Sequence, residues 1–128
     1  MRKEKKVDEL SLRDKMRIVQ EIVPGKQITL AHIIANPNEV LYEKLGLDTS
    51  VDYKGSAIGI ITISPAETAI IAADIAIKSS GAEVGFVDRF SGTLIITGTV
   101  SSVEEATESI LKYSEETLGY TVCKVTKT

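Results

Sequence analysis

The chain has 128 residues, the length of one ordinary domain, and a net charge of −3. An acidic balance argues against nucleic acid as the main partner, because phosphate binding needs a basic surface. A single cysteine, Cys123, excludes an internal disulfide, and a single histidine, His32, argues against a metal site. No apolar run could span a bilayer and the sequence does not open with a signal-peptide core, so we expect a cytosolic protein.

The first stretch differs in charge from the rest. Residues 1–17 carry seven Lys/Arg and four Asp/Glu, a net +3, so the remainder carries −6. Residues 1–15 form no convincing helical stripe and predict a mobile tail, with a short docking helix as the alternative. Residues 16–23 predict a strand that has apolar residues on both faces. Pro24 and Gly25 then suit a type II turn.

A second strand is predicted over residues 27–35. Its period of two places His32 on one face with Ile28, Leu30 and Ile34, which indicates a hydrogen-bonded core histidine rather than a catalytic one. A short helix should follow, with Asn36 as its cap, Pro37 and Glu39 in its first turn and Gly46 after its end. Residues 47–56 are a polar connection where a hinge or exposed loop is expected.

The centre of the chain, residues 57–100, predicts a strand, a capped helix and two further strands. The first strand, 57–63, includes Gly59, which permits close approach of a neighbouring backbone. Ser64 and Glu67 have the spacing of a capping box, so the helix is expected from Pro65 to Ser80. That spacing favours capping over a catalytic role for the same two side chains. Strands over 83–87 and 93–100 are joined by a tight loop, 88–92.

The predicted helix over 65–80 has almost no polar face. Its strongly polar residues, Glu67, Asp74 and Lys78, lie on one narrow stripe, and the rest is mainly Ala and Ile. A surface helix of a monomer shows a broad polar face. We therefore expect part of its cover to come from another subunit.

The last helix and a closing strand complete the predicted elements. Ser101 or Ser102 can cap the helix, with a glutamate three residues on in either register. Its buried stripe is predicted to contain Val103, Ala106, Ile110, Tyr113 and Leu118. Gly119 ends the helix, and residues 120–125 predict the closing strand.

The order β-β-α-β-α-β-β-α-β fits an α+β fold, a ferredoxin-like sandwich with helices over a mainly antiparallel sheet. The sequence contains no nucleophile motif, phosphate-binding loop or metal-ligand spacing, so no catalytic residue, metal or cofactor is assigned. Such sandwiches also serve as oligomeric small-molecule-sensing regulatory domains, which is the alternative function. A third and less favoured possibility is an enzyme of unrecognised type.

The run from Ala57 to Glu108 resembles the bacterial microcompartment shell domain, or BMC domain. The matching features are the AIGI strand, the Ala-rich helix ending DIAIK, the VGF…SG loop and the VEEA of the next helix. The segment QITLAHIIANPNEVLYEKLGL precedes this unit, whereas a similar segment follows it in the common domain. The chain therefore resembles the circularly permuted branch, the EutS/PduU type of ethanolamine- and propanediol-utilisation compartments, over about residues 16–128.

The resemblance implies a structural tile rather than an enzyme. Members of this family form cyclic hexamers that pack, with other hexamers and pentamers, into a polyhedral shell around enzymes, which are candidate partners. The expected location is the shell of a microcompartment in the cytoplasm. The implied domain covers residues 16–128, with 16–26 as a barrel-type strand and turn and 1–15 as a charged tail.

The resemblance also implies three sets of site residues. The loop between the two strands that follow the Ala-rich helix should line the sixfold axis, where one side chain becomes a ring of six. Its residues are Asp88, Arg89, Phe90, Ser91 and Gly92. The alternative is a plain hairpin turn whose charges pair with neighbours. A strand containing Met16, Ile18, Val19, Gln20 and Ile22 should help form a small barrel over the pore. Lys78 and Asn36 match positions at the hexamer edge, where Asn36 replaces the family's arginine.

Overall fold

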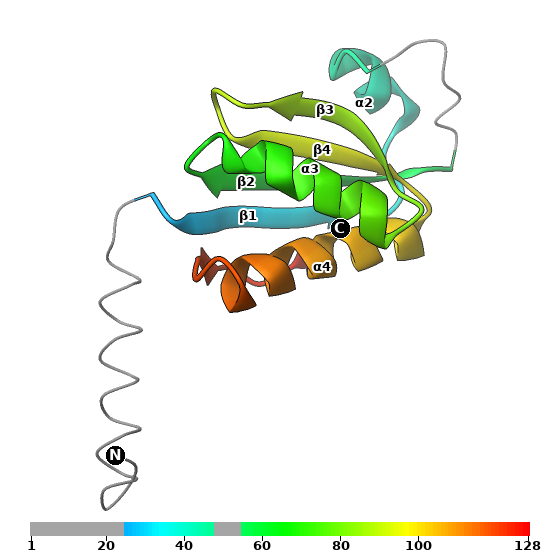
Figure 1. The fold of residues 1–128 in the computed structure, drawn as a ribbon. Helices are drawn as coiled ribbons and strands as arrows, with labels where there is room; N and C mark the ends of the chain where they lie inside the picture. Colours follow the sequence, from blue (N-terminus) through cyan, green and yellow to red (C-terminus); the bar gives the residue numbers. More distant parts are fainter. Residues whose placement is uncertain (1–24, 48–54) are drawn as a thin grey trace, which may run out of the picture.

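The computed structural model describes residues 25–47 and 55–128 of the chain (Figure 1). The described residues form one sheet with helices on both of its faces. The helices are α2 (Glu39–Lys44), α3 (Thr68–Ser79) and α4 (Val100–Glu116). The strands are β1 (Gln27–Ile34), β2 (Ala57–Ser64), β3 (Glu83–Asp88), β4 (Thr93–Gly98), β5 (Thr121–Val122) and β6 (Thr126–Lys127).

The strand order explains how a ferredoxin-like sandwich is permuted here. The sheet runs β3-β4-β2-β1-β5, with β6 also paired to β1. The unit β2-α3-β3-β4-α4-β5 has the connectivity of a βαββαβ sandwich, whose last strand normally lies beside its first. Here β1 occupies that place, antiparallel to β2, and β5 is displaced to the far side of β1. The α+β fold class predicted from the sequence is confirmed.

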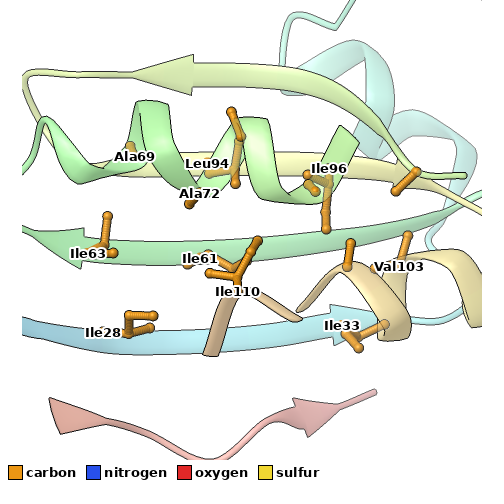
Figure 2. Packing of buried hydrophobic residues seen from close by; sticks show 14 of the residues in the cluster. Ile28, Ile33, Ile61, Ile63, Ala69, Ala72, Leu94, Ile96, Val103 and Ile110 are labelled. Carbon is orange, nitrogen blue, oxygen red and sulfur yellow. The ribbon is translucent and has the colours of Figure 1, made fainter. Parts of the chain in front are cut away.

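The main core lies between the sheet and the helices α3 and α4 (Figure 2). Strand residues that alternate along β1, β2 and β4 point to this side, among them Ile33, Ile61 and Leu94. The face of α3 that meets them is made of alanines, Ala69, Ala72, Ala73 and Ala76. Small side chains let the helix lie close to the sheet, and three of its four isoleucines, Ile70, Ile71 and Ile77, are left exposed.

Gly59 is needed in β2 because α4 and β4 approach it closely, as the sequence suggested. A Cβ atom there would lie 2.8 Å from Cγ1 of both Ile96 and Val103. The neighbours are side chains, however, rather than the expected backbone. On the opposite face of the sheet, Tyr42 and Leu47 from the α2 region pack on Ile58 and Ile95. Leu47 is therefore buried, although it was predicted to begin an exposed connection.

A bulge in β1 changes the predicted face of His32. The register between β1 and β2 shifts between Ile28 and Leu30. A bulge inserts an extra residue and reverses the alternation beyond it, so Ile28 and Ile33 both face the main core. His32 is half-buried on the other face and does not share a face with Ile28. It is hydrogen-bonded as predicted, but it is not a core residue.

The closing strand is split into two short strands rather than running over 120–125. Gln27 lies opposite Thr121 and His32 opposite Thr126, so β5 and β6 pair with β1 in one continuous register. The interruption falls beside the bulge of β1, where the regular ladder is lost. Tyr120 ties this segment to α3, because its hydroxyl lies 2.9 Å from that of Thr68.

The N-terminal caps of all three helices differ from those predicted. Asn38, not Asn36, caps α2 and accepts a hydrogen bond from the Val40 N–H. Thr99, not Ser101 or Ser102, caps α4 and accepts from the Ser102 N–H. Neighbouring Asn, Ser and Thr residues are chemically equivalent caps, and the choice depends on where the preceding strand or turn ends.

No side-chain capping box forms at α3. Ser64 is the last residue of β2, the Ser64–Pro65 peptide bond is cis, and the helix begins three residues later than predicted. The N–H groups of Thr68, Ala69 and Ile70 instead bond to the carbonyls three residues before them. These backbone bonds satisfy the first helical donors, so a Ser64 cap is not needed.

The buried stripe of α4 is partly as predicted. Val103, Ala106 and Ile110 are buried, whereas Tyr113 is 42% exposed. Leu118 lies beyond the end of the helix and is half-buried. Thr107 and Ser114, which were not predicted to be buried, are buried on α4. The Thr107 hydroxyl donates to the Val103 carbonyl. This local bond allows a hydroxyl to be buried within a helix.

The predicted tail over 1–15 and the predicted strand over 16–23 lie outside the described residues, as do residues 48–54 of the predicted connection. Gly25, where the description begins, has the positive φ of 85° that the turn requires, and Gly46 has a φ of 71° just after α2. Within residues 25–47 and 55–128, no helix is both long and apolar enough to cross a membrane.

Candidate functional site

The loop between β3 and β4, residues 88–92, is closed by Asp88. Its carboxylate accepts a hydrogen bond from the Phe90 N–H at 2.8 Å and another from the Ser91 hydroxyl at 2.8 Å. The Asp88 carbonyl accepts from the Gly92 N–H at 2.9 Å. These donors, first the backbone of Phe90 and then Ser91, lower the pKa of Asp88 below its ordinary value. The Asp88 carboxylate therefore holds the loop closed through these hydrogen bonds.

Gly92 fixes this loop against the end of β2. Its carbonyl accepts from the Ile63 N–H at 2.9 Å. Its φ is 76°, and a Cβ atom there would lie 2.1 Å from the Ile63 carbonyl oxygen. Only glycine fits this conformation and this approach. Because Gln27 lies opposite Ser64, the loop and the start of β1 sit at the same end of the sheet (Figure 1).

The tip of the loop presents a cation beside an aromatic ring. Phe90 is 80% exposed, and the Arg89 guanidinium lies over its ring, 4.9 Å from the centroid. A hollow of about 320 Å³ on one side of the tip is lined by Ile70, Val87, Asp88, Arg89 and Phe90. A second, of about 450 Å³, is lined by Ala66, Glu67, Arg89 and Phe90. The tip therefore combines an exposed cation with a large exposed aromatic side chain.

Large apolar side chains are also uncovered along one edge of the molecule, which we call the α3–β3 edge. Ile70 is 52% and Ile77 59% exposed on α3, while the edge strand β3 exposes side chains on both of its faces. The members of the α3–β3 edge are Ile70, Ile71, Ile77, Phe86 and Val87. Exposure of large apolar side chains on two elements that pack together marks an interaction site. It agrees with the prediction that another subunit covers the helix.

The two predicted edge residues, Lys78 and Asn36, are both exposed, but they belong to different elements. Lys78 lies in the last turn of α3 and pairs with Asp74 at 2.8 Å, with 74% of its side chain exposed. This hydrogen bond and the charge of Asp74 raise the pKa of Lys78. Asn36 lies between β1 and α2. Within the described residues, no hydrogen bond or ion pair joins it to Lys78.

A hollow beside Lys78 was not predicted from the sequence. It measures about 330 Å³ and is lined by Ile71, Asp74, Ile75, Lys78, Ser79 and Tyr113. The exposed ring of Tyr113 forms its α4 side. The Ser79 hydroxyl is buried and has no hydrogen-bond partner in the structure. Tyr113 was the residue that could have indicated this hollow. We missed it because Tyr113 was assigned to the buried stripe of the last helix.

His32 is held by the C-terminal strand. Its Nδ1 lies 2.6 Å from the Thr126 hydroxyl and its Nε2 lies 2.9 Å from the Thr128 hydroxyl. Backbone bonds from Thr128 N–H to the Ile33 carbonyl and from Ala35 N–H to the Thr128 carbonyl flank it. Both ring nitrogens are thus engaged in joining β6 to β1, which explains the residue structurally.

The predicted pore-cap residues, 16 to 22, lie outside the described part of the chain. Among residues 25–47 and 55–128, no three His, Cys, Asp or Glu side chains are grouped so as to hold a metal ion. Burial raises the pKa of the Cys123 thiol above its usual value, which disfavours the reactive thiolate. The features that stand out are the loop tip and the α3–β3 edge.

A fold of this permuted kind with an exposed loop and an uncovered helix is that of a shell domain, and comparison with known proteins bears this out. Residues 57–126 match the family model of the BMC domain. The chain belongs to the BMC-domain family. Strand β1 and helix α2 precede the matched region.

Two curated relatives cover most of the chain. It is 52% identical over 112 residues to the bacterial microcompartment shell protein PduU of Salmonella typhimurium, covering 88% of this chain and 93% of that protein. It is 50% identical over 114 residues to the shell protein EutS of Escherichia coli, covering 89% and 98%. These relatives confirm the resemblance to the EutS/PduU type. They give no support to a sensory regulatory domain.

Solved structures of the shell protein CutR are similar in three dimensions. A flat hexamer of CutR has a TM-score of 0.76 and 49% identity, covering 84% of this chain and 95% of that chain. CutR also forms a screw with a pitch of 41.9 Å, at a TM-score of 0.74 and 50% identity, covering 82% and 100%. The fold is thus compatible with more than one arrangement of subunits in that relative.

Proposed function

We propose that this chain is a tile of a microcompartment shell, of the ethanolamine- or propanediol-utilisation type, and that it assembles as a cyclic homohexamer. The α3–β3 edge is the observation that carries the proposal, because α3 buries alanines and leaves isoleucines exposed. A cyclic ring joins two different surfaces of successive subunits. Burying this edge against the next subunit removes its apolar surface from water.

The loop 88–92 is proposed to line the axis of that hexamer. Its tip lies beside the α3–β3 edge, since Ile70 and Val87 share a hollow with Phe90. Covering that edge draws the tips of neighbouring subunits together. The loop is also rigid, because Asp88 and Gly92 hold it from both sides. Rigid loops of this kind suit a narrow opening of fixed width.

Residues 16–23 are proposed to cap the pore by pairing between subunits. A hairpin with β1 would need a free edge of that strand, but Gln27 pairs with Ser64 of β2 on one side and Thr121 of β5 on the other. The chain also enters β1 at the end of the sheet where the loop 88–92 lies. We therefore expect a strand over 16–23 to begin near the axis and to pair with a neighbouring subunit, because β1 offers it no free edge at Gln27.

The proposal also includes the remaining expectations from the sequence. The tile is non-enzymatic, and residues 16–128 form its domain, preceded by a charged tail over 1–15. Its partners are further copies of itself, other shell hexamers and pentamers, and encapsulated enzymes. Its location is the shell of a microcompartment in the cytoplasm. Lys78 and Asn36 belong to the edge at which hexamers meet.

Ile70→Glu tests the proposed subunit interface. Ile70 is half-exposed in the single chain, so the subunit should keep its fold while a charge is forced into the covered edge. Size-exclusion chromatography with light scattering should show dissociation, with an unchanged far-ultraviolet circular dichroism spectrum. Ser101→Glu, at an exposed position on α4, is the matched control and should remain hexameric. A hexamer of Ile70→Glu as stable as the control would contradict the interface.

A further inference from the structure

The outer side of α3 has two apolar flanks, and they line different hollows. Ile70 lines the hollow beside the loop 88–92, whereas Ile71 and Ile75 line the hollow that Tyr113 of α4 closes. The proposed contact between neighbouring subunits of the ring covers the flank of Ile70 and Ile77. The other hollow, of about 330 Å³, is a separate surface, which we call the α3–α4 groove.

The α3–α4 groove has both apolar and polar groups that a partner could cover. Ile71 is 45% and Tyr113 42% exposed, so large apolar surface still faces water on both helices. Ser79 lines the same groove, and its hydroxyl is buried without a hydrogen-bond partner among the described residues. An occupant that covered the apolar walls and reached this hydroxyl would therefore stabilise the subunit.

The α4 side of the groove is negatively charged. Helix α4 contains five glutamates and one lysine, and its last turn has no basic residue. Glu116 lies three residues after Tyr113, so the helical spacing places both on one side of α4. Glu116 is exposed and forms no ion pair within residues 25–47 and 55–128. Acidic side chains are unfavourable at the C-terminal end of a helix, so a cationic partner would stabilise this end.

The chain that precedes β1 enters the fold beside the same end of α4. The Lys26 carbonyl accepts from the Thr121 N–H at 3.1 Å. The Tyr120 N–H in turn donates to the carbonyl of Ser114, the residue next to Tyr113, at 2.9 Å. The N-terminal residues therefore join the fold close to the Tyr113 end of the α3–α4 groove.

The first fifteen residues have the chemistry that complements this groove. The run over 2–6, RKEKK, contains four basic residues and one acidic residue, and Leu10 and Leu12 are apolar. The proposed strand over 16–23 would extend about 26 Å, because a strand rises about 3.3 Å per residue. Fifteen further residues can span about 50 Å, which is enough to return to the subunit.

We propose that residues 1–15 dock on the α3–α4 groove. In this arrangement the leucines of the segment cover Tyr113 and Ile71, and its basic run lies against the acidic end of α4. The contact combines apolar burial with opposite charge, and each of these is missing from the groove of the described chain. The inference goes beyond the proposed function and does not need the hexamer, because the groove and the entry to β1 belong to one subunit.

Limited proteolysis of the full chain with trypsin tests the docking. Trypsin cleaves after Lys and Arg, so mass spectrometry can follow the release of fragments that end at Lys6, Arg13 or Lys15. Tyr113→Ala should raise the rate of release several-fold, because a docked segment is protected and this change removes an apolar wall of the groove. Val40→Ala removes an exposed apolar side chain from α2 and should leave the rate unchanged. Equal rates in the two variants would contradict the docking.

Glu116→Gln tests the electrostatic part of the contact. It should raise the rate of release less than Tyr113→Ala does, because an exposed charge contributes little. Glu43→Gln removes the same charge from an exposed position on α2 and should have no effect. An equal increase in both variants would show that trypsin responds to the net charge of the protein, and it would overturn the proposed contact with the acidic end of α4.

Disulfide cross-linking in the full chain identifies the occupant. Ser109 is half-buried one turn before Tyr113 on α4. In a Cys123→Ser background, Leu10→Cys with Ser109→Cys should link under mild oxidation, and Leu10→Cys with Val40→Cys should not. A link between two Ser109→Cys positions instead would show that a second copy covers the groove, and it would overturn the proposal. Hexamers by light scattering without the Leu10→Cys link would refute the docking and leave the proposed function intact.

Discussion

At the scale of single residues, Gly92 decides the shape of the loop through its backbone alone. Its positive φ turns the chain, and its carbonyl bonds to Ile63 at the end of β2. Asp88 completes the loop by accepting from Phe90 and Ser91. Arg89 and Phe90 are then free to face outward together. The loop is therefore built by two residues and presents two others.

Gly92→Ala should be clearly more destabilising than the same change at Gly46. Both glycines have a positive φ, which costs an L-residue about 1–2 kcal/mol. At Gly46 a Cβ meets nothing within 4 Å, whereas at Gly92 it lies 2.1 Å from a carbonyl oxygen. Urea unfolding at one fixed protein concentration measures the difference. Equal midpoints for the two variants would show that the loop moves away from β2 at little cost.

The role of a residue could be predicted from the sequence only where one residue type suits the position and no neighbour could take the same role. Gly46 and Gly25 were identified because each occupies a turn position that favours a positive φ. Caps were misplaced because Asn36 and Asn38 are equivalent as residues and differ only in where β1 ends. The separate roles of Asp88 and Arg89 depend on hydrogen bonds within a turn of five residues. No periodic pattern encodes these bonds.

At the scale of elements, β1 determines the organisation of the sheet. It lies between β2 and the C-terminal strands, and both of its edges are used at Gln27. The order and type of the described elements were predicted, because long apolar runs and strong breakers separate them. The bulge near Leu30 was not, since a single inserted residue leaves the apolar composition unchanged. That bulge explains both the position of His32 and the division between β5 and β6.

Deleting residues 1–23 should leave a folded hexamer whose pore mouth is open. The described partners of β1 are β2 on one side and β5 and β6 on the other, so its sheet is formed by residues outside the deletion. Thermal unfolding and electron microscopy of the shortened chain measure the two parts of this expectation. Cooperative loss of the fold on deletion would place the segment in the core of its own subunit.

At the scale of the whole molecule, the distribution of apolar residues is that of a subunit rather than a monomer. The sequence already indicated this, because the predicted helix over 65–80 has only three strongly polar residues, all on one stripe. The structure adds that three of its four isoleucines are exposed and that the neighbouring strand β3 exposes Phe86 and Val87. How subunits and tiles meet was beyond prediction from one chain. Such contacts depend on shape complementarity between surfaces that lie far apart in the sequence.

Lys78→Ala should impair tiling without affecting the hexamer. Its pair with Asp74 is highly exposed, so it contributes little to the stability of the subunit. Sheets seen by negative-stain microscopy should become sparse, while light scattering still reports hexamers. Because Asn36 is shorter than arginine and uncharged, tiling should depend strongly on Lys78. Loss of hexamers, or sheets as extensive as before, would remove Lys78 from the tile edge.

The central claim is that this chain closes into a ring of six through the α3–β3 edge. Native mass spectrometry of the full-length chain at micromolar concentration tests it most directly, because it counts the subunits in each assembly. We expect a hexamer as the dominant species, with Ile70→Glu shifting the spectrum toward smaller assemblies. A spectrum of the unaltered protein that contained only monomers or dimers would contradict it.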